Sequence, residues 1–353
     1  MRIIVNDAAA VSGGALTILK GFYNYIIDYD TDNEWIFIVS TNQIIENKKI
    51  KVVNFSKKKQ GWIKRLKFDF LTGGQFINSL KPDIVLSLQN TITYGVKAPQ
   101  VVYMHQPIPF QDVKNFSFIK RSEYKYAIYQ YIIGFLIKKS LRNADAIIVQ
   151  TEWIRKAVIK KTGISGENVY KVFPNIPSYS NFVRVGKFDR KKYFYPASKY
   201  IYKNHKCIYD ASSILRKKGC FDFTIELTID EDIYRENIMF IGDIPFLDVI
   251  NKYNESTLIF PSFIETVGLP LAEAREIGTI ILASDCSFSR EILNGYANAY
   301  FFNPFKPNEL ALLIEKILCG FIVKQDVFKN SELKNNSWDE VVNILYKTLE
   351  QHL

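Results

Sequence analysis

The chain has 353 residues, of which 48% are hydrophobic and 14% aromatic, and its formal net charge at pH 7 is +10. This length and apolar content allow a large buried core and predict two domains. A transmembrane helix is excluded, because the longest apolar run, residues 126–137, is shorter than the roughly 18 to 20 residues that a bilayer span needs. We also expect no signal peptide, since residues 1–5 lead directly into a loop without a small-residue cleavage site.

The first half of the chain alternates short apolar runs with helical patterns, which predicts a doubly wound α/β domain with a parallel sheet. The expected strands lie near residues 2–6, 35–39, 51–54, 84–88, 101–104, 146–150 and 169–173. The main expected helices lie at 15–27, 63–80, 118–141 and 151–162. Pro174 and Pro177 mark the connection to the next domain, so we place the first domain at 1–177.

The second half repeats this alternation and predicts a second Rossmann-like domain at 178–330. Its strands are expected near 193–196, 223–227, 239–242, 257–260, 280–283 and 299–302. The remaining residues, 331–353, contain an amphipathic helix with Trp338, Val341, Leu345 and Leu349 on one stripe. Open parallel sheets bind ligands beyond the carboxyl ends of their strands, so two such domains facing each other predict a binding cleft.

The positive charge is concentrated in the first half of the chain. Residues 1–178 contain 25 Lys and Arg against 13 Asp and Glu, whereas residues 179–353 contain 21 against 23. Such a surface attracts nucleic acid, anionic lipid headgroups or phosphorylated substrates. Cations alternate with aromatic and aliphatic residues in 57–68 and 116–140, as in helices that lie in a membrane interface. The alternative is an amphipathic helix packed on a sheet, which we favour for 116–140, whereas membrane contact is favoured for 57–68.

Neither the cysteines nor the aspartates predict a metal site. The four cysteines have no C-x-x-C spacing, and we expect each to be a reduced, buried thiol: Cys207, Cys220, Cys286 and Cys319. Asp28, Asp30 and Asp32 form a D-x-D pattern that binds divalent ions in other proteins. Here the pattern follows a predicted helix instead of a strand, so we interpret it as a polar surface loop.

The most informative segment carries two glutamates, Glu265 and Glu273, at an E-x7-E spacing. It reads as a strand end, a turn, and a helix opened by Pro270 at its first position, with Glu273 in the first helical turn. The backbone N–H groups of Gly268 and Leu269 would point out of the helix start, where a phosphate binds favourably. A phosphate seat flanked by carboxylates suits a nucleotide-sugar, because carboxylates accept hydrogen bonds from ribose and sugar hydroxyls. The alternative is that Glu273 complements the helix dipole and Glu265 is a solvated loop charge.

Two further features follow strands of the first domain. Gly13 and Gly14 precede the first helix and would permit close approach of a diphosphate or an acceptor, although the pattern is not G-x-G-x-x-G. His105 stands directly after the strand at 101–104. A simple turn and a structural histidine are the respective alternatives.

The sequence around the two glutamates resembles the E-x7-E signature of retaining glycosyltransferases of family 4, which have the GT-B architecture. The resemblance extends over most of the chain and includes the segments 237–242, 258–262, 278–284 and 289–292. It implies that the glycine pair faces the donor across the cleft and that His105 lies near the transferred sugar. It also implies that the closing helix at 331–353 often crosses back to the first domain.

The resemblance further implies that cationic side chains after the first strand of the second domain bind the diphosphate. Lys203 matches the family's lysine, which offsets charge on the departing nucleotide. The family's arginine is absent; Ser198 and Lys199 stand in its neighbourhood, and Lys199 would act there as a point charge without bidentate geometry.

These expectations describe a cytoplasmic enzyme that is peripheral on the inner face of the cell membrane. It would transfer a sugar from a nucleotide-diphosphate-sugar to a hydroxyl of a lipid-linked saccharide, with retention and without a metal or other cofactor. Its partners would be the donor, the acceptor and an anionic membrane surface, but no nucleic acid. One alternative is a sugar-nucleotide epimerase of the same architecture. The other is a non-catalytic basic protein that binds membrane or nucleic acid.

Overall fold

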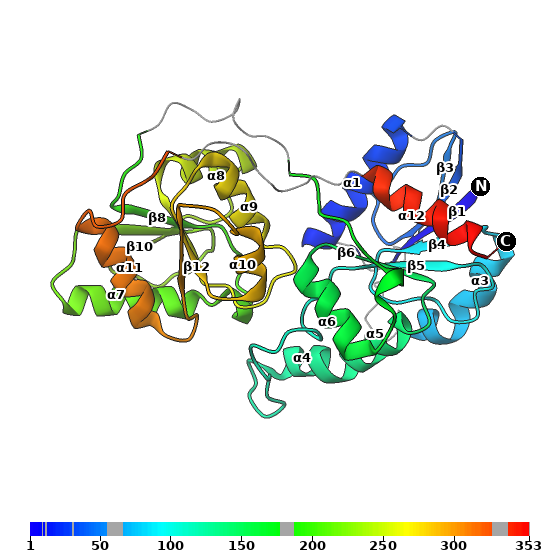
Figure 1. Cartoon of the computed structure of the whole chain (residues 1–353), viewed down its shortest axis with the longest axis horizontal. Helices are drawn as coiled ribbons and strands as arrows, with labels where there is room; N and C mark the ends of the chain where they lie inside the picture. The colour runs from blue at the N-terminus through cyan, green and yellow to red at the C-terminus, as the bar shows by residue number, and fades with distance from the viewer. Residues whose placement is uncertain are drawn as a thin grey trace.

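The structure, a computed structural model, describes residues 1–8, 10, 13–29, 32–54, 66–176, 187–326 and 338–352. It contains two parallel sheets, one in each half of the chain (Figure 1). The first has the strand order β3-β2-β1-β4-β5-β6-β7 and the second the order β10-β9-β8-β11-β12-β13. Both orders reverse direction beside the first strand of the domain, which is the topological switch point of doubly wound folds. The predicted fold class is confirmed.

The first domain alternates strands and helices along residues 2–171. Its central strands β4 and β6 are buried at every residue, as expected for a parallel sheet covered on both faces. Its elements are β1 (Arg2–Asp7), α1 (Gly13–Tyr29), β2 (Glu34–Val39), β3 (Ile50–Asn54), η1 (Phe68–Thr72), α3 (Gly73–Ser79), β4 (Ile84–Ser87), β5 (Gln100–Met104), α4 (Tyr124–Ala127), η2 (Ile128–Ile133), α5 (Gly134–Leu141), β6 (Ala146–Val149), α6 (Glu152–Thr162), η3 (Gly166–Asn168) and β7 (Val169–Lys171).

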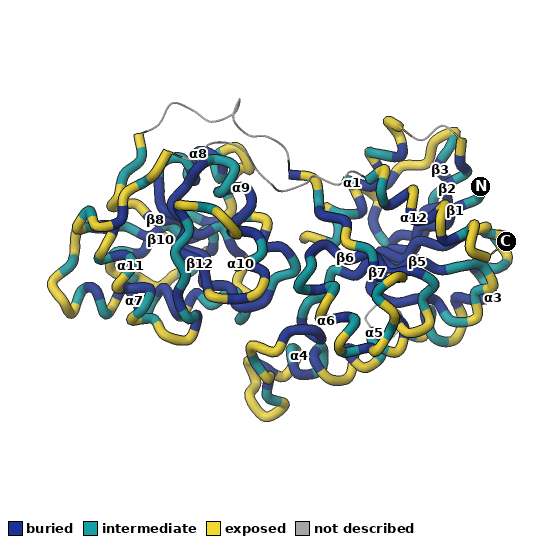
Figure 2. The backbone as a smooth tube through the Cα atoms, in the orientation of Figure 1, coloured by how far each residue is buried: buried dark blue, intermediate teal, exposed yellow. Residues whose placement is uncertain are grey.

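The second domain follows the same plan, and its interior strands β11 and β12 are likewise buried throughout. Figure 2 shows the buried interior of the domain in dark blue. Its elements are β8 (Lys192–Tyr195), η4 (Ile201–Lys203), α7 (His205–Lys217), β9 (Thr224–Leu227), β10 (Ile238–Phe240), α8 (Phe246–Glu255), β11 (Thr257–Phe260), α9 (Leu269–Ile277), β12 (Ile281–Ser284), α10 (Ser287–Ile292), β13 (Ala299–Phe302) and α11 (Pro307–Leu318).

The last helix, α12 (Trp338–Glu350), packs against the first domain. Val341 and Leu345 are fully buried in the same apolar cluster as β1 and α1. The Trp338 ring lies 5.2 Å from that of Phe22 and 5.9 Å from that of Tyr103. In Figure 1 this helix, drawn in red, lies beside α1. The last described segment of the chain therefore completes the core of the first domain.

The helix predicted over 118–141 is wrong in its first six residues, because α4 begins at Tyr124. The Glu123 carboxylate accepts a hydrogen bond from the Ser117 N–H at 3.0 Å and pairs with Lys114 at 3.0 Å. These contacts fold the preceding residues into turns instead of a helical turn.

Other predictions fall partly on residues that the structure does not describe. The basic segment 57–68 lies almost wholly outside the described residues, and so does Asp30 of the D-x-D pattern. Cys207 and Cys286 are buried as expected, whereas Cys220 is only partly buried. Cys319 is exposed, so the expectation of burial is wrong there, because this residue follows the last turn of α11. Within the described ranges, no helix is long and apolar enough to cross a membrane.

Candidate functional site

The candidate site is centred on the loop that joins β11 to α9, residues 261–268. Gly268 ends this loop with φ +75° and ψ 63°, a left-handed conformation that glycine adopts without strain. Neither the Gly268 nor the Leu269 N–H donates a hydrogen bond to a residue that the structure describes. Two unpaired amides at a helix start form a binding site for an anion, and the amides of Gly268 and Leu269 are called the anion seat below.

The helix begins one residue earlier than the sequence predicts. Leu269 is its first residue, so Pro270 occupies the second position, and Glu273 lies in the second turn instead of the first. Proline is still tolerated there, because the second N–H of a helix has no intrahelical acceptor. Glu273 is therefore the fifth residue of the helix, one position farther from its start than expected.

Glu265 is fixed in place and is not a solvated loop charge. Its Oε1 atom lies 2.5 Å from the Lys203 ammonium and accepts a hydrogen bond from the Ser262 hydroxyl at 2.6 Å. The Lys203 and Glu265 side chains are 17% and 15% exposed, so the ion pair is largely shielded from solvent. The structure thus brings together two of the residues that the sequence singled out.

Lys203 is positioned by a tight turn between η4 and α7. Asn204 adopts a left-handed conformation with φ +60°, and its side-chain amide donates to the carbonyls of Pro261 at 3.2 Å and Pro304 at 2.8 Å. The Tyr195 hydroxyl donates to the Lys203 carbonyl at 2.9 Å. These bonds tie the lysine turn to the loop that carries Glu265.

Lys199 is placed differently. Its ammonium donates a hydrogen bond to the backbone carbonyl of Asp230, in the loop after β9. Lys203, not Lys199, is the cation that pairs with Glu265. Lys199 is therefore not a second cation at that carboxylate.

Glu273 is a carboxyl group in an apolar environment. Its Oε2 atom accepts a hydrogen bond from the Tyr253 hydroxyl at 3.1 Å. Burial raises the pKa of Glu273 to about 7, and the hydrogen bond from Tyr253 opposes this rise only in part. Near neutral pH the group exchanges between its protonated and ionised forms.

The first domain contributes a fixed loop after β5. The side-chain oxygen of Asn90 accepts from the His105 N–H at 2.7 Å and from the Gln106 N–H at 3.0 Å. Asn90 itself has φ +70°, which Asn tolerates better than most residues. His105 thus stands at the carboxyl end of its strand, as the sequence predicts.

The glycine pair starts α1 instead of preceding it, because Gly13 and Gly14 are its first two residues. A side chain added at Gly14 would meet no atom within 4 Å, so the space beside this helix start is open. A side chain at Gly14 would therefore not clash with the described part of the chain.

The two domains touch close to these residues. Tyr126 of α4 packs edge-on against Tyr202 at 5.9 Å, and its hydroxyl accepts a hydrogen bond from the Ile201 N–H at 3.3 Å. Lys114 lies 5.9 Å from the ring of Phe263, in the loop of Glu265. Both domains therefore contribute to the surroundings of the Lys203–Glu265 pair.

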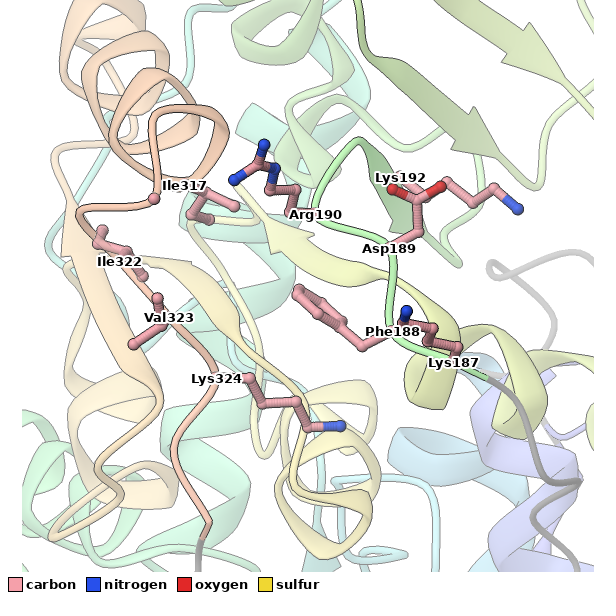
Figure 3. A pocket seen from close by; sticks show the side chains of 10 residues that line it. Lys187, Phe188, Asp189, Arg190, Lys192, Ile317, Ile322, Val323 and Lys324 are labelled. Carbon is pink, nitrogen blue, oxygen red and sulfur yellow. The ribbon is translucent and has the colours of Figure 1, made fainter.

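A cavity of about 680 Å³ lies elsewhere, at the amino-terminal edge of the second sheet. Figure 3 shows Phe188 and Arg190 directed toward the segment of Ile317 and Ile322, whereas Lys192 points away from it. This cavity contains none of the residues singled out by the sequence. Among the described residues, no group of three or more His, Cys, Asp or Glu side chains could hold a metal ion.

The second domain and the overall fold are each similar to known proteins. Residues 189–330 match the family model of glycosyl transferases group 1, which covers the second domain. Over 216 residues the chain is 22% identical to the O-antigen chain mannosyltransferase RfbU of Salmonella typhimurium. That alignment spans 57% of this chain and 57% of the relative.

Several solved structures share the fold over essentially the whole chain. The lipopolysaccharide outer core galactosyltransferase WaaB is 16% identical with a TM-score of 0.64, and the match covers 100% of both chains. Sucrose-phosphate synthase from Thermosynechococcus elongatus is 14% identical with a TM-score of 0.66, again over 100% of both chains. Anabaena HepE in complex with UDP-glucose is 14% identical with a TM-score of 0.63, over 100% of this chain and 99% of that one. The fold is therefore GT-B, and the comparisons together support glycosyltransferase activity.

Proposed function

We propose that the protein is a retaining glycosyltransferase that takes its sugar from a nucleotide-diphosphate-sugar. The observation that carries this proposal is the Lys203–Glu265 ion pair, held by Ser262, on the same loop as the unpaired amides of Gly268 and Leu269. A fixed cation, a fixed carboxylate and an anion seat are the groups needed to hold a diphosphate and an attached sugar.

Each group then has a defined role. The bond between the anomeric carbon and the diphosphate oxygen breaks, the acceptor oxygen forms the new bond, and the acceptor proton leaves with the nucleoside diphosphate. Lys203 and the amides of Gly268 and Leu269 stabilise the charge that develops on the diphosphate. Glu265 accepts hydrogen bonds from the donor sugar, and Glu273 accepts them from the ribose. This cation and these amides supply the stabilisation from the protein itself, so we expect turnover in the presence of EDTA.

The first domain completes the site in this proposal. His105 donates a hydrogen bond to an oxygen of the transferred sugar, and the open helix start at Gly13 and Gly14 receives the donor or acceptor from the opposite side. Lys199 contributes long-range positive charge toward the diphosphate but no direct contact with Glu265. Closure of the two domains would exclude the water that hydrolyses an activated sugar.

The acceptor is proposed to be a lipid-linked saccharide at the surface of an anionic membrane, in the synthesis of a bacterial surface polysaccharide. Two of the similar proteins are named for the O-antigen chain and the lipopolysaccharide outer core. In this chain, an exposed aromatic and basic patch extends along residues 118–139, from the turns before α4 to α5. Its apolar members are 42% to 96% exposed, and its members are Phe118, Ile119, Tyr124, Tyr131, Ile132 and Phe135 together with Lys120, Arg121, Lys125 and Lys139.

The patch has the chemistry of a membrane-surface segment. The ring of Phe118 lies 6.4 Å from that of Tyr124 and 5.6 Å from that of Tyr131, so the exposed aromatics form one cluster instead of isolated side chains. Exposed aromatics insert among headgroups, and the cations beside them attract anionic lipids. The exposure of these side chains argues against the alternative of a helix packed entirely on a sheet.

Charge neutralisation in this patch is expected to weaken membrane binding. The triple substitution of Lys120, Arg121 and Lys125 by glutamine should lower the affinity for vesicles with 30% phosphatidylglycerol about 100-fold, at roughly 1 kcal/mol per cation. Sedimentation with vesicles at low and physiological salt measures this. The matched control substitutes Lys206, Lys217 and Lys316 of the second domain, which are also exposed. Equal binding by both triple variants and the wild type would rule out this surface.

Donor affinity is expected to depend on pH through Glu273. Only the ionised carboxylate accepts two ribose hydrogen bonds, and the pKa of Glu273 is raised to about 7. The affinity for a nucleoside diphosphate should therefore rise about tenfold between pH 6 and pH 8, because one ionisation is linked to binding. Calorimetric titration of the wild type and Glu273→Gln checks this, and any pH dependence that remains in the variant belongs to the diphosphate.

The thermal stability of the Glu273→Gln variant serves as a control for its folding. A carboxyl pKa raised above its unfolded value of about 4.5 costs stability once the pH exceeds that value, and the cost is complete above pH 7. Glu273→Gln should therefore unfold at a higher temperature than the wild type at pH 8. A weaker donor complex in a more stable protein would locate the defect at the site. An identical pH profile in both proteins would remove Glu273 from the donor site.

The activity itself is tested by following nucleoside diphosphate release from uridine-, guanosine-, thymidine- and adenosine-diphosphate sugars in EDTA. Slow release from one of them is expected even without an acceptor, through transfer to water. Once a productive donor is found, proton NMR of the first product assigns its anomeric configuration, and inversion would contradict the retaining mechanism.

A further inference from the structure

At the start of α6, the groups that would normally cap the helix form hydrogen bonds with the second domain instead. Thr151 is the N-cap residue of this helix, but its hydroxyl makes no bond to the helix's own amides. It donates instead to the Thr266 carbonyl of the second domain at 3.0 Å. The amides of Glu152 and Trp153 are capped by the Glu291 carboxylate of the second domain, at 2.7 and 2.8 Å.

Thr266 is the residue next to Glu265 in the 261–268 loop. Its carbonyl accepts a second hydrogen bond from the first domain, from the Trp153 indole N–H at 2.8 Å. Two donors on one carbonyl fix the orientation of that peptide, which lies between Glu265 and the amides of the anion seat. The loop that carries the proposed donor site is therefore held by side chains of the other domain.

These hydrogen bonds act where the packing between the domains is incomplete. A cavity of about 360 Å³ lies beside Trp153, and its walls include Phe110 of the first domain and Phe263 and Phe288 of the second. The hydrogen bonds of Thr151 and Trp153 therefore lie beside a part of the junction that side chains do not fill. A threonine N-cap that bonded its own helix would be satisfied in separated domains as well. Here the amides of Glu152 and Trp153 have the Glu291 carboxylate as their acceptor only when the domains are docked.

We propose that Thr151, Trp153 and Glu291 are positioning residues that order the 261–268 loop for the donor when the domains dock. This inference rests on the proposed function, since the loop carries Glu265 and the anion seat. It adds that donor affinity depends on first-domain residues that do not touch the donor. Undocked domains would leave the Thr266 carbonyl free to rotate and the donor loop disordered.

The test uses Trp153→Phe, which keeps the ring but removes the N–H, and Thr151→Val, which keeps the shape but removes the hydroxyl. Each should raise the donor KM and the Kd for the tightest-binding of UDP, GDP, ADP and dTDP by about fivefold, the effect of one hydrogen bond. The double variant should raise both by about 20-fold and accelerate amide hydrogen exchange in residues 265–269. Glu291→Gln should weaken nucleotide binding by about tenfold, because the charge-assisted cap is lost.

Two controls separate positioning from general damage. Thr151→Ser retains the hydroxyl and should restore wild-type affinity. Arg155→Ala removes side-chain bonds from α6 to the carbonyls of Val169 and Gly166 within the first domain, at 2.8 and 2.7 Å, and should lower stability without changing nucleotide affinity. If the wild type binds nucleotide and the double variant binds it equally well, the positioning role is wrong and the proposed function stands. If the wild type binds no nucleoside diphosphate, both are wrong.

Discussion

Replacing Glu265 by glutamine is expected to lower kcat by about 10²- to 10³-fold, the usual effect of removing one fixed polar group that acts on the transition state. Glutamine keeps the size of the side chain but loses the charge that pairs with Lys203 at 2.5 Å. Its amide also offers one acceptor oxygen instead of two, so it cannot bond Ser262, Lys203 and the donor sugar together. Steady-state measurement of nucleoside diphosphate release gives kcat and KM.

The matched control is Glu315→Gln, which breaks an ion pair of similar length with Lys218, 2.6 Å, on the surface of the second domain. A surface pair contributes little to stability, so this variant should retain wild-type kcat and KM. If Glu265→Gln retained wild-type kcat as well, the carboxylate would have no role in the reaction and the site would have to lie elsewhere.

Replacing Lys203 by methionine is expected to lower kcat by a similar factor, about 10²- to 10³-fold, because the departing diphosphate loses its nearest side-chain cation. The substitution also leaves the Glu265 carboxylate without its partner in a largely shielded position, which is unfavourable. The double variant of Lys203→Met with Glu265→Gln should therefore be no slower than the worse single variant. Independent, multiplicative losses would show that the two residues do not act as one unit.

Lys199 provides an internal comparison for this prediction. Since its ammonium bonds the Asp230 carbonyl and not Glu265, Lys199→Met should lower kcat less than tenfold. A loss as large as that for Lys203→Met would show that Lys199 grips the diphosphate directly, as the family's arginine does. The pair of measurements therefore identifies which cation holds the leaving group.

The fold could be predicted from local pattern, because parallel strands covered on both faces are continuous apolar runs. The strands at 257–260 and 299–302 coincide with β11 and β13, and the other expected strands differ by one or two residues at their ends. The exception is the chain before α4, where Glu123 pairs with Lys114. These two residues are nine positions apart in the sequence, and neither helical nor strand periodicity indicates that they pair.

The candidate site, like the fold, could be predicted only in part. Candidate residues that follow strands, such as His105 and Glu265, could be placed from the sequence, because ligands of open sheets lie beyond the carboxyl ends of strands. Residues that hold them could not, since Asn90 reaches His105 from the preceding loop and Tyr253 reaches Glu273 from α8. Asn90 and Asn204, both with positive φ, gave no signal of their own, because an asparagine in a turn is common.

The hydrogen bonds between the domains at the start of α6 give a further reason why the contacts of the site could not be predicted from the sequence. The sequence places Thr151 inside the expected helix at 151–162, whereas in the structure it is the N-cap residue of α6 and its hydroxyl bonds across the domain contact, while Glu291 caps the helix amides. These residues are about 140 positions apart, so only the folded arrangement of the domains reveals these bonds. Sequence pattern predicts elements and their ends, whereas tertiary packing decides which polar groups meet.

The position of the donor can be determined from a crystal structure with a bound nucleoside diphosphate. We expect its diphosphate oxygens within hydrogen-bonding distance of the Gly268 and Leu269 amides and of the Lys203 ammonium, with the ribose against Glu273. A diphosphate bound instead in the 680 Å³ cavity beside Arg190 and Lys324, with the 261–268 loop unoccupied, would contradict this expectation.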